Sequence, residues 1–168
     1  DGYTSGYHIT NLLIHEFNGI VFYLVMRIIL NLPYFKHRLI SRYSNTVSLF
    51  AALIFACHPI QVNAVTYIVQ RTASLAATFY LLAIYFFLRY RTKDRPYYLF
   101  LTFLSTVLAM FTKENTITIP FMLLLIEIMF FLRDGRTTLI KRILVFLLLF
   151  STVPIIPGTN LILKGYSQ

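Results

Sequence analysis

The polar segment from His58 to Arg71 carries the side chains best suited to bind a phosphate or to orient a hydroxyl group. It separates two strongly apolar runs, residues 46–56 and 73–88. Imidazole, amide and guanidinium groups are costly in hydrocarbon unless they face water, a partner or a ligand. The segment therefore predicts a functional site, and the residues expected to line it are His58, Gln61, Asn63, Gln70 and Arg71.

Arg71 comes directly before the third apolar run of the chain, and Thr72 follows it as a candidate helix cap. An arginine beside a helix N-terminus offers a planar guanidinium fork and oriented N–H groups, and both suit a phosphate. We therefore expect Arg71 to bind a phosphate. The alternative is that Arg71 only anchors the span among the lipid headgroups.

A second polar junction, Lys113-Glu114-Asn115, separates two later apolar runs. Lys113 at a membrane boundary is placed to meet a lipid phosphate. Glu114 would order Lys113 or Arg71, and Asn115 would line the same site. The alternative is an ordinary interfacial ion pair, which contributes little.

The first apolar run carries four polar residues at spacings of three, four and three: His8, Asn11, His15 and Asn18. This spacing places them on one helical face that extends over about 15 Å. Two interpretations stay open. The face either makes hydrogen bonds to neighbouring helices, or it lines a water-filled cavity continuous with the segment from His58 to Arg71. The spacing of the two histidines predicts no metal site.

The composition predicts a membrane protein. Of the 168 residues, 58% are hydrophobic and 12% are charged, and the mean hydropathy is +0.71, whereas about a quarter of the residues of soluble domains are charged. A span needs about 20 apolar residues, and only helices satisfy an isolated backbone in lipid. We therefore expect an all-α polytopic protein with about six spans: 9–34, 46–69, 72–88, 97–111, 116–132 and 143–163. Cys57 is the single cysteine, so the chain forms no internal disulfide.

Pro59 should interrupt the second span at His58-Pro59, because proline lacks a backbone donor. Beyond it, Val62, Val65 and Val69 form an apolar stripe while Asn63, Thr66 and Gln70 form a polar one. This pattern predicts a short amphipathic helix at the membrane interface.

Basic residues gather in alternate connections, and this distribution predicts the orientation of the chain. The residues concerned are Lys36, Arg38, Arg42, Arg89, Arg91, Lys93, Arg95, Arg133, Arg136, Lys141 and Arg142. By the positive-inside rule these connections are cytoplasmic and both chain ends are non-cytoplasmic. The net charge of +9 then reflects orientation and does not indicate nucleic-acid binding. Arg91 is expected to be an ordinary loop residue, and Arg27 or Arg133 is expected to neutralise Glu127.

Residues 1–168 are expected to form a single transmembrane helical domain, and two observations favour a fragment of a longer protein. The chain opens on the outer side, and its first residue is Asp1 rather than methionine. An upstream span with an outer loop would explain both.

Four blocks of the chain resemble successive blocks of one family: residues 6–15, 58–61, 64–71, and 113–115 followed by Pro120. The family consists of the bacterial TPR-containing relatives of the transmembrane-and-TPR O-mannosyltransferases, within the GT-C glycosyltransferase superfamily. The resemblance implies transfer of a sugar from a polyprenyl-phosphate carrier on the non-cytoplasmic face. It assigns site positions to His58, Gln70, Arg71, Lys113 and Glu114, with Arg71 and Lys113 at the donor phosphate.

The chain departs from this pattern in ways that bear on catalysis. Asn63 stands where relatives often have an acid, and Thr72-Ala73-Ser74 stands where they often have an aspartate soon after the arginine. The catalytic carboxylate and the TPR repeats are expected upstream and downstream of these residues, so no catalytic base is assigned here.

The resemblance also implies a setting. The expected location is a bacterial inner membrane with the site facing the periplasm, and the expected ligands are membrane lipids and a lipid-linked sugar. No cofactor is expected apart from the polyprenyl-phosphate sugar as donor substrate. The alternative function is a non-catalytic membrane subunit that binds lipid and packs within a larger membrane complex.

Overall fold

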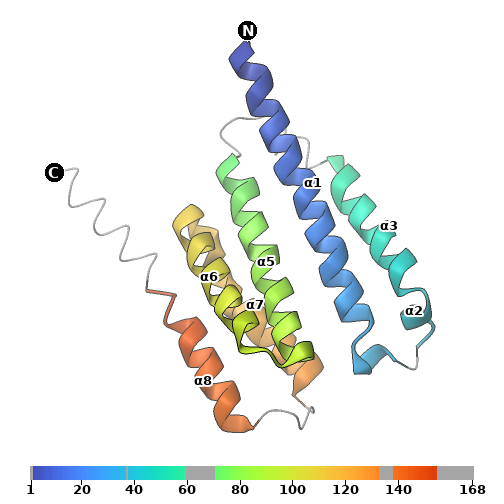
Figure 1. The fold of residues 1–168 in the computed structure, drawn as a ribbon, viewed down its shortest axis with the longest axis vertical. Helices are drawn as coiled ribbons and strands as arrows, with labels where there is room; N and C mark the ends of the chain where they lie inside the picture. Colours follow the sequence, from blue (N-terminus) through green and yellow to red (C-terminus); the bar gives the residue numbers. More distant parts are fainter. Residues whose placement is uncertain (1, 37, 60–70, 133–137, 155–168) are drawn as a thin grey trace, which may run out of the picture.

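A computed structural model describes residues 2–36, 38–59, 71–132 and 138–154 of the chain, with side chains from residue 9 onward. Every regular element in these ranges is helical, which confirms the expected all-α class (Figure 1). In chain order the elements are α1 (Gly2–Leu30), η1 (Pro33–Phe35), α2 (Leu39–Arg42), α3 (Ser44–Cys57), α5 (Arg71–Lys93), α6 (Pro96–Thr112), η4 (Glu114–Thr118), α7 (Ile119–Ile126), the π-helix η5 (Glu127–Phe131) and α8 (Leu139–Phe150).

Three of the described helical stretches are long and apolar enough to cross a membrane: Ile9–Leu30, Arg71–Lys93 and Glu114–Phe131. Two shorter apolar helices, α3 and α6, have 14 and 17 residues. At 1.5 Å per residue, α3 is about 21 Å long, which is less than the thickness of a bilayer core. The six spans and the non-cytoplasmic chain ends remain predictions.

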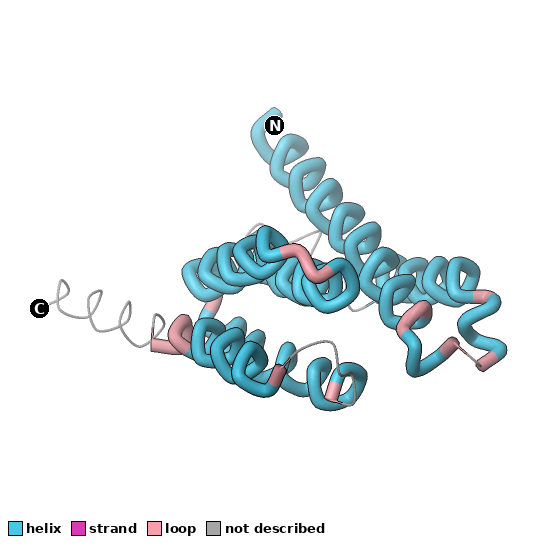
Figure 2. The backbone as a smooth tube through the Cα atoms, turned by 60° about the horizontal axis from the view of Figure 1, so that its bottom comes forward, coloured by secondary structure: helices cyan, strands magenta, loops and turns pink. Residues whose placement is uncertain are grey.

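α5 lies at the centre of the helix arrangement. It packs against α1 on one side and α6 on the other, and α1 in turn packs against α3 (Figure 1). Short loops connect most of the helices (Figure 2). The core between α1, α5 and α7 is filled by Val21, Val25, Phe87, Leu88 and Leu123.

Polarity is distributed in the opposite way to that of a soluble protein. Large apolar side chains face outward on several helices, among them Leu13, Phe50, Ile54, Phe100 and Leu147. Several polar side chains are instead buried between helices, including Asn11, Asn18, Ser48, Thr102 and Thr106. Apolar surface toward lipid and polar groups toward other helices are what a bilayer favours. The chain is therefore an integral membrane protein.

The second span breaks where Pro59 predicts. α3 ends at Cys57, and His58 follows in an extended conformation with ψ of 130°. The reason is local, because a proline ring disfavours the helical conformation of the residue before it. The expected interfacial helix, together with Gln61, Asn63 and Gln70, lies outside the described residues.

A connection of only two residues, Asp94-Arg95, joins α5 to α6. Asp94 has a φ of 49°, in the left-handed region that aspartate tolerates better than most residues. Pro96 then occupies the first turn of α6, where its missing N–H is not needed. α5 and α6 therefore form a tight antiparallel hairpin.

Glu127 has partners other than those expected from the sequence. Its carboxylate lies 2.8 Å from Nε of Arg91 and 3.5 Å from Nε of Arg142. Arg27 is exposed, and Arg133 lies outside the described residues. Arg91 is thus a buried ion-pair partner, and the expectation of an ordinary loop residue was wrong, because the last turn of α5 faces η5 and α8.

Candidate functional site

A cavity of about 390 Å³ lies between α1, α3, α5 and η4. Most of its wall is apolar and comes from Phe22, Phe55, Ala73, Ala76, Ala77, Tyr80 and Leu81. Its polar lining comes from the η4 corner, namely Lys113, Asn115 and Thr116. The cavity is therefore amphipathic, with an apolar interior and a cationic group on one side.

Small side chains on α5 leave the space that larger ones on α1 and α3 enclose. Ala73, Ala76 and Ala77 recur at helical spacing on one face of α5. Opposite them, the rings of Phe22 and Phe55 stack with centroids 5.1 Å apart. The pair forms a rigid apolar wall that joins α1 to α3.

Backbone and hydroxyl hydrogen bonds position the cationic side of the cavity. Lys113 follows α6 in an extended conformation, and its N–H donates to the carbonyl oxygen of Ala109 at 3.1 Å. The Thr116 hydroxyl donates to the Lys113 carbonyl oxygen at 2.6 Å, and the Thr118 hydroxyl donates to that of Asn115 at 3.0 Å. The backbone of Lys113 is thus held in place while its side chain is exposed.

Arg71 and His58 lie at the same end of the helix bundle as Lys113. α3 and α6 end there and α5 begins there (Figure 1). Arg71 is the half-buried first residue of α5, and Ala73, two residues further, lines the cavity beside Lys113. Glu114 is exposed at the start of η4. A shared phosphate between Arg71 and Lys113 remains a prediction.

The polar face of α1 connects the helices that carry these residues. Asn11, His15 and Asn18 are all at most 5% exposed. His15 Nε2 lies 3.0 Å from the carbonyl oxygen of Ala56, and Asn18 Nδ2 donates to that of Ser74 at 3.1 Å. His15 and Asn18 thus support the interpretation of this face as an interhelical one.

The bond to Ala56 has a clear physical reason. The last carbonyls of a helix have no donor within the helix, and an unsatisfied carbonyl is costly in a membrane. His15 supplies that donor to the final turn of α3, and its ring also stacks on Phe55 with centroids 5.8 Å apart. The roles of His8, Asn11 and His15 as lining residues of a ligand site remain predictions; the side chain of His8 is outside the described residues.

The cavity wall was missed by sequence reasoning. Phe22, Phe55 and Tyr80 look like ordinary membrane-span residues, since nothing in their spacing distinguishes them. The closest signal in the sequence is the group of alanines in residues 73–77. Among the described residues, no three His, Cys, Asp or Glu side chains gather in a way that would hold a metal ion.

The fold and the cavity together define a helical integral membrane protein with an amphipathic site at one end of its helix bundle. The family described as dolichyl-phosphate-mannose-protein mannosyltransferase matches residues 11–159. This match covers most of the chain, so the chain belongs to that family, and the resemblance found in the sequence blocks is confirmed.

One curated relative is the human protein O-mannosyl-transferase TMTC3. It is 28% identical to this chain over 134 residues, which are 78% of this chain and 13% of the relative. The chain thus spans about an eighth of that protein's length. No solved structure matches the chain.

Proposed function

We propose that this chain forms the donor-binding part of a membrane glycosyltransferase related to mannosyltransferases. The donor would be a sugar on a polyprenyl phosphate, with the phosphate between Arg71 and Lys113. The observation that carries the proposal is the amphipathic cavity, whose apolar wall ends at Lys113 on the side of the bundle where α5 begins with Arg71.

The cavity suits such a molecule in size and polarity. Small-molecule sites usually measure about 300–1,000 Å³ and are largely apolar with a few polar groups, and this cavity measures about 390 Å³. The first isoprene units of the carrier would lie against Phe22 and Phe55. The sugar would then face the solution beyond Lys113.

The charges suit the chemistry of transfer. When the bond between the sugar and the carrier breaks, negative charge develops on the phosphate that leaves. Arg71 and Lys113 would stabilise that charge, and groups placed in advance for this purpose are often the largest single contribution to catalysis. The N–H groups at the start of α5 would add to the effect.

The remaining site residues would surround the acceptor side. His58, which follows α3, would lie there with Gln61, Asn63 and Gln70, while Glu114 and Asn115 would orient Lys113. The carboxylate that removes the acceptor proton is expected upstream of this chain. The charge distribution supports a non-cytoplasmic site, which in a bacterial inner membrane would face the periplasm.

A non-catalytic membrane subunit is the second candidate. His15 and Asn18 support this candidate, because they make hydrogen bonds between helices. Under the catalytic hypothesis, their face of α1 would instead line a cavity. Such a subunit would keep the helix bundle and bind lipid without transferring a sugar. Its extensive exposed apolar surface would then pack against other membrane proteins.

A transfer assay on the full-length protein separates these candidates. The protein is reconstituted in vesicles with radiolabelled mannosyl phosphoryl polyprenol, and both donor binding and release of the sugar from the carrier are measured. Binding with transfer supports the enzyme, whereas binding without transfer to any tested acceptor supports the subunit. Absence of donor binding contradicts the proposed donor site.

A further inference from the structure

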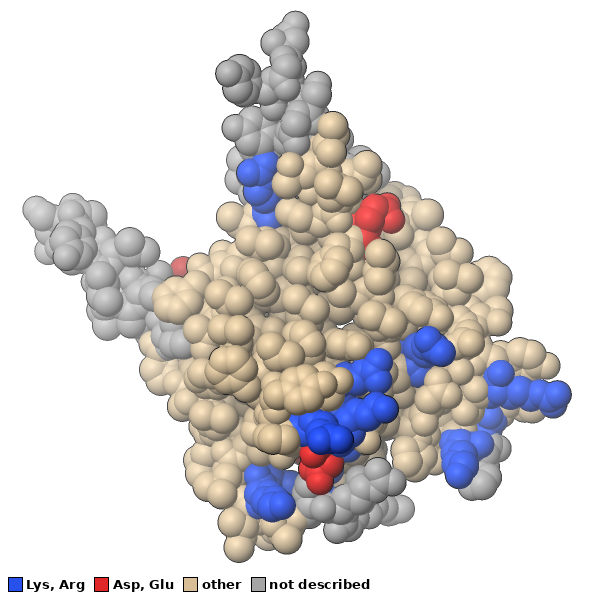
Figure 3. Space-filling model, in the orientation of Figure 1, with Lys and Arg blue, Asp and Glu red and all other residues tan. Residues whose placement is uncertain are grey.

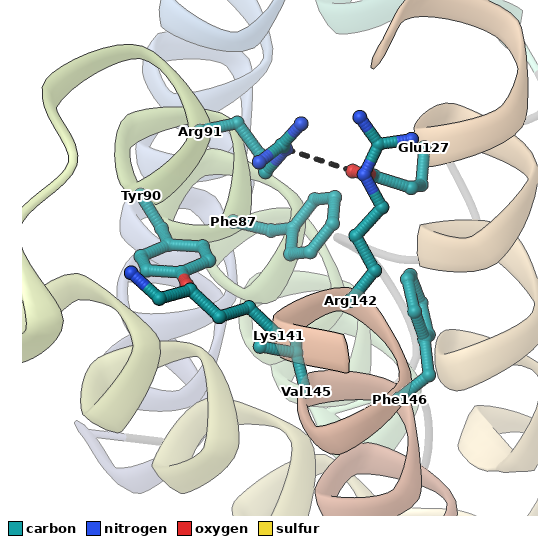
Figure 4. Close-up of a pocket in the computed structure, with 8 residues that line it drawn as sticks. All are labelled: Phe87, Tyr90, Arg91, Glu127, Lys141, Arg142, Val145 and Phe146. Atoms are coloured by element: carbon teal, nitrogen blue, oxygen red, sulfur yellow. Dashed lines mark ion pairs between the residues drawn. The ribbon is translucent and has the colours of Figure 1, made fainter. Parts of the chain in front are cut away.

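The large cavity between α1, α3, α5 and η4 has little charge of its own. Lys113 is the one charged residue among the described residues that line it. On the face drawn in Figure 3, the Lys and Arg side chains gather mostly at the opposite end of the molecule. There, Arg91 and Arg142 lie against the Glu127 carboxylate, and the recess beside them measures only about 10 Å³, too little for an organic ligand (Figure 4). A phosphate in the large cavity would therefore gain from a neutral hydrogen-bond donor beside Lys113.

Tyr80 on α5 carries a hydroxyl group at this position. Its ring is half-buried, packs against the hydrophobic core and lines the cavity. Helix side chains lean toward the helix N-terminus, and α5 begins at the end of the bundle where Lys113 lies. The Tyr80 hydroxyl oxygen is 3.4 Å from Oγ1 of Thr118, the last residue of η4. The hydroxyl group thus lies where the apolar wall of the cavity meets the η4 corner.

The proton in this contact comes from Tyr80. The Thr118 hydroxyl donates to the carbonyl oxygen of Asn115 at 3.0 Å, and a hydroxyl group has only one proton to donate. Between the two hydroxyls, Tyr80 therefore donates and Thr118 accepts. At 3.4 Å the bond is long, because O–H···O hydrogen bonds usually measure about 2.5–3.0 Å. Tyr80 thus holds a donor proton that is only weakly bound.

A phosphate oxygen would be a better acceptor for that proton than Thr118. Hydrogen bonds from a hydroxyl to an anionic oxygen measure about 2.5–2.7 Å and are roughly twice as strong as those between neutral groups. The exchange would break only the 3.4 Å contact, and Thr118 would keep its bond to Asn115. The proton turns about the C–O bond of the phenol, so the packed ring need not move.

We infer that Tyr80 donates a hydrogen bond to the phosphate of an isoprenoid-linked ligand, whose apolar part lies against Phe22 and Phe55. The inference rests on the proposed donor site and adds a neutral phosphate-binding residue to it. Tyr80 then distinguishes a phosphorylated isoprenoid from the corresponding alcohol. A ring that serves only for packing would make no such distinction.

The matched pair Tyr80→Phe and Tyr23→Phe tests the inference in the full-length protein. Each variant loses only a hydroxyl group, and Tyr23 is half-buried on α1 outside the described lining of the cavity. Binding of radiolabelled farnesyl phosphate and of farnesol is measured in detergent, and thermal unfolding checks that each variant is folded. Phosphatidylglycerol is added as a competitor, because its headgroup is another source of phosphate.

We expect the wild type to bind farnesyl phosphate more tightly than farnesol. Tyr80→Phe should weaken binding of farnesyl phosphate by about ten-fold, as is typical for loss of one hydrogen bond to a charged group, and should leave farnesol binding unchanged. Tyr23→Phe should change neither. Phosphatidylglycerol should displace farnesyl phosphate less readily than unlabelled farnesyl phosphate does.

Two kinds of contrary result are distinguishable. If Tyr80→Phe leaves farnesyl phosphate binding unchanged, or weakens both ligands equally, the inference is overturned while the donor site stands. Displacement by phosphatidylglycerol as readily as by unlabelled farnesyl phosphate would also overturn it, because the site would then accept any lipid phosphate. Equal binding of farnesyl phosphate and farnesol by the wild type would overturn the proposed phosphate site together with the role of Tyr80.

Discussion

The ring of His15 donates from Nε2 to the backbone oxygen of Ala56 at 3.0 Å, so α1 provides the hydrogen-bond donor that the last turn of α3 lacks. The direction follows from the chemistry, because a carbonyl oxygen accepts only and the ring nitrogen must carry the proton. His58 lies two residues beyond this carbonyl. The bond therefore holds the end of α3 from which the polar segment starts.

Replacing His15 with leucine should lower the stability of the protein by about 1 kcal/mol, since polar bonds between membrane helices contribute roughly 0.6–2 kcal/mol. Unfolding of the full-length protein in detergent would measure this. His15→Gln is the matched variant, because its amide retains a donor and should recover part of the loss. Equal stability of the leucine variant and the wild type would show that the bond contributes nothing.

Replacing Arg71 with alanine should reduce sugar transfer by about 100-fold, which is typical for loss of one group that stabilises a developing negative charge. Arg71→Lys should also be impaired, because a point charge does not reproduce a bidentate fork. Initial rates of transfer from the lipid-linked donor would test both variants.

The control for these variants is Arg95→Ala. Arg95 is exposed, lies at the opposite end of the bundle and makes no side-chain cap to α6. Arg91 is unsuitable as a control, because it pairs with Glu127. Transfer by Arg71→Ala at the rate of Arg95→Ala would remove Arg71 from the donor site.

Enlarging Ala77 should block the cavity. Ala77→Leu adds three carbon atoms to the wall opposite Phe22 and Phe55, and these would displace part of the carrier chain from the cavity. Each carrier methylene that is no longer buried costs about 0.8 kcal/mol, so the carrier chain should bind at least about ten-fold more weakly. Ala51→Leu, at a half-buried position of α3 outside the cavity lining, is the control. Unchanged donor binding by both variants would place the carrier elsewhere.

Arg91 and Glu127 should show strong energetic coupling. Both side chains are at most 5% exposed, and loss of one partner of a buried pair typically costs about 3–5 kcal/mol. We expect Arg91→Met and Glu127→Gln each to lower the free energy of unfolding. The loss in the double variant should be smaller than the sum of the two single losses. A double-mutant cycle on thermal unfolding measures this coupling. Strict additivity would mean that the pair is not coupled in the membrane.

The orientation of the chain can be tested at Lys93. In a Cys57→Ala background, Lys93→Cys should resist an impermeant thiol reagent added outside intact cells and react after the membrane is opened. The reason is the collection of basic residues in this connection, which favours the cytoplasmic side. Labelling from outside would reverse the proposed orientation.

Helix positions and the break at Pro59 were predictable because they depend on local properties. The apolar runs located the described helices but not all of their ends: α1 begins at Gly2, seven residues before its predicted span, and α8 ends at Phe150, inside the predicted span 143–163. The proline restricted the residue before it. The partners of Glu127 were not predictable, because Arg91, Glu127 and Arg142 come from three elements separated by long stretches of sequence. Nor was the cavity, since it depends on where helix packing leaves small side chains without neighbours.

The tight connection at Asp94 has a consequence for the far side of the membrane. α5 and α6 leave it in opposite directions, and Arg71 lies 23 residues before Asp94 while Lys113 lies 18 residues after Arg95. At 1.5 Å per residue, Arg71 stands about 7.5 Å further from the connection than Lys113. A single inserted residue would move one cation relative to the other by about 1.5 Å and turn it by about 100°. The connection at Asp94-Arg95 thus determines how deep Arg71 and Lys113 lie in the membrane, although it is at the opposite end of α5 and α6 and contacts neither cation.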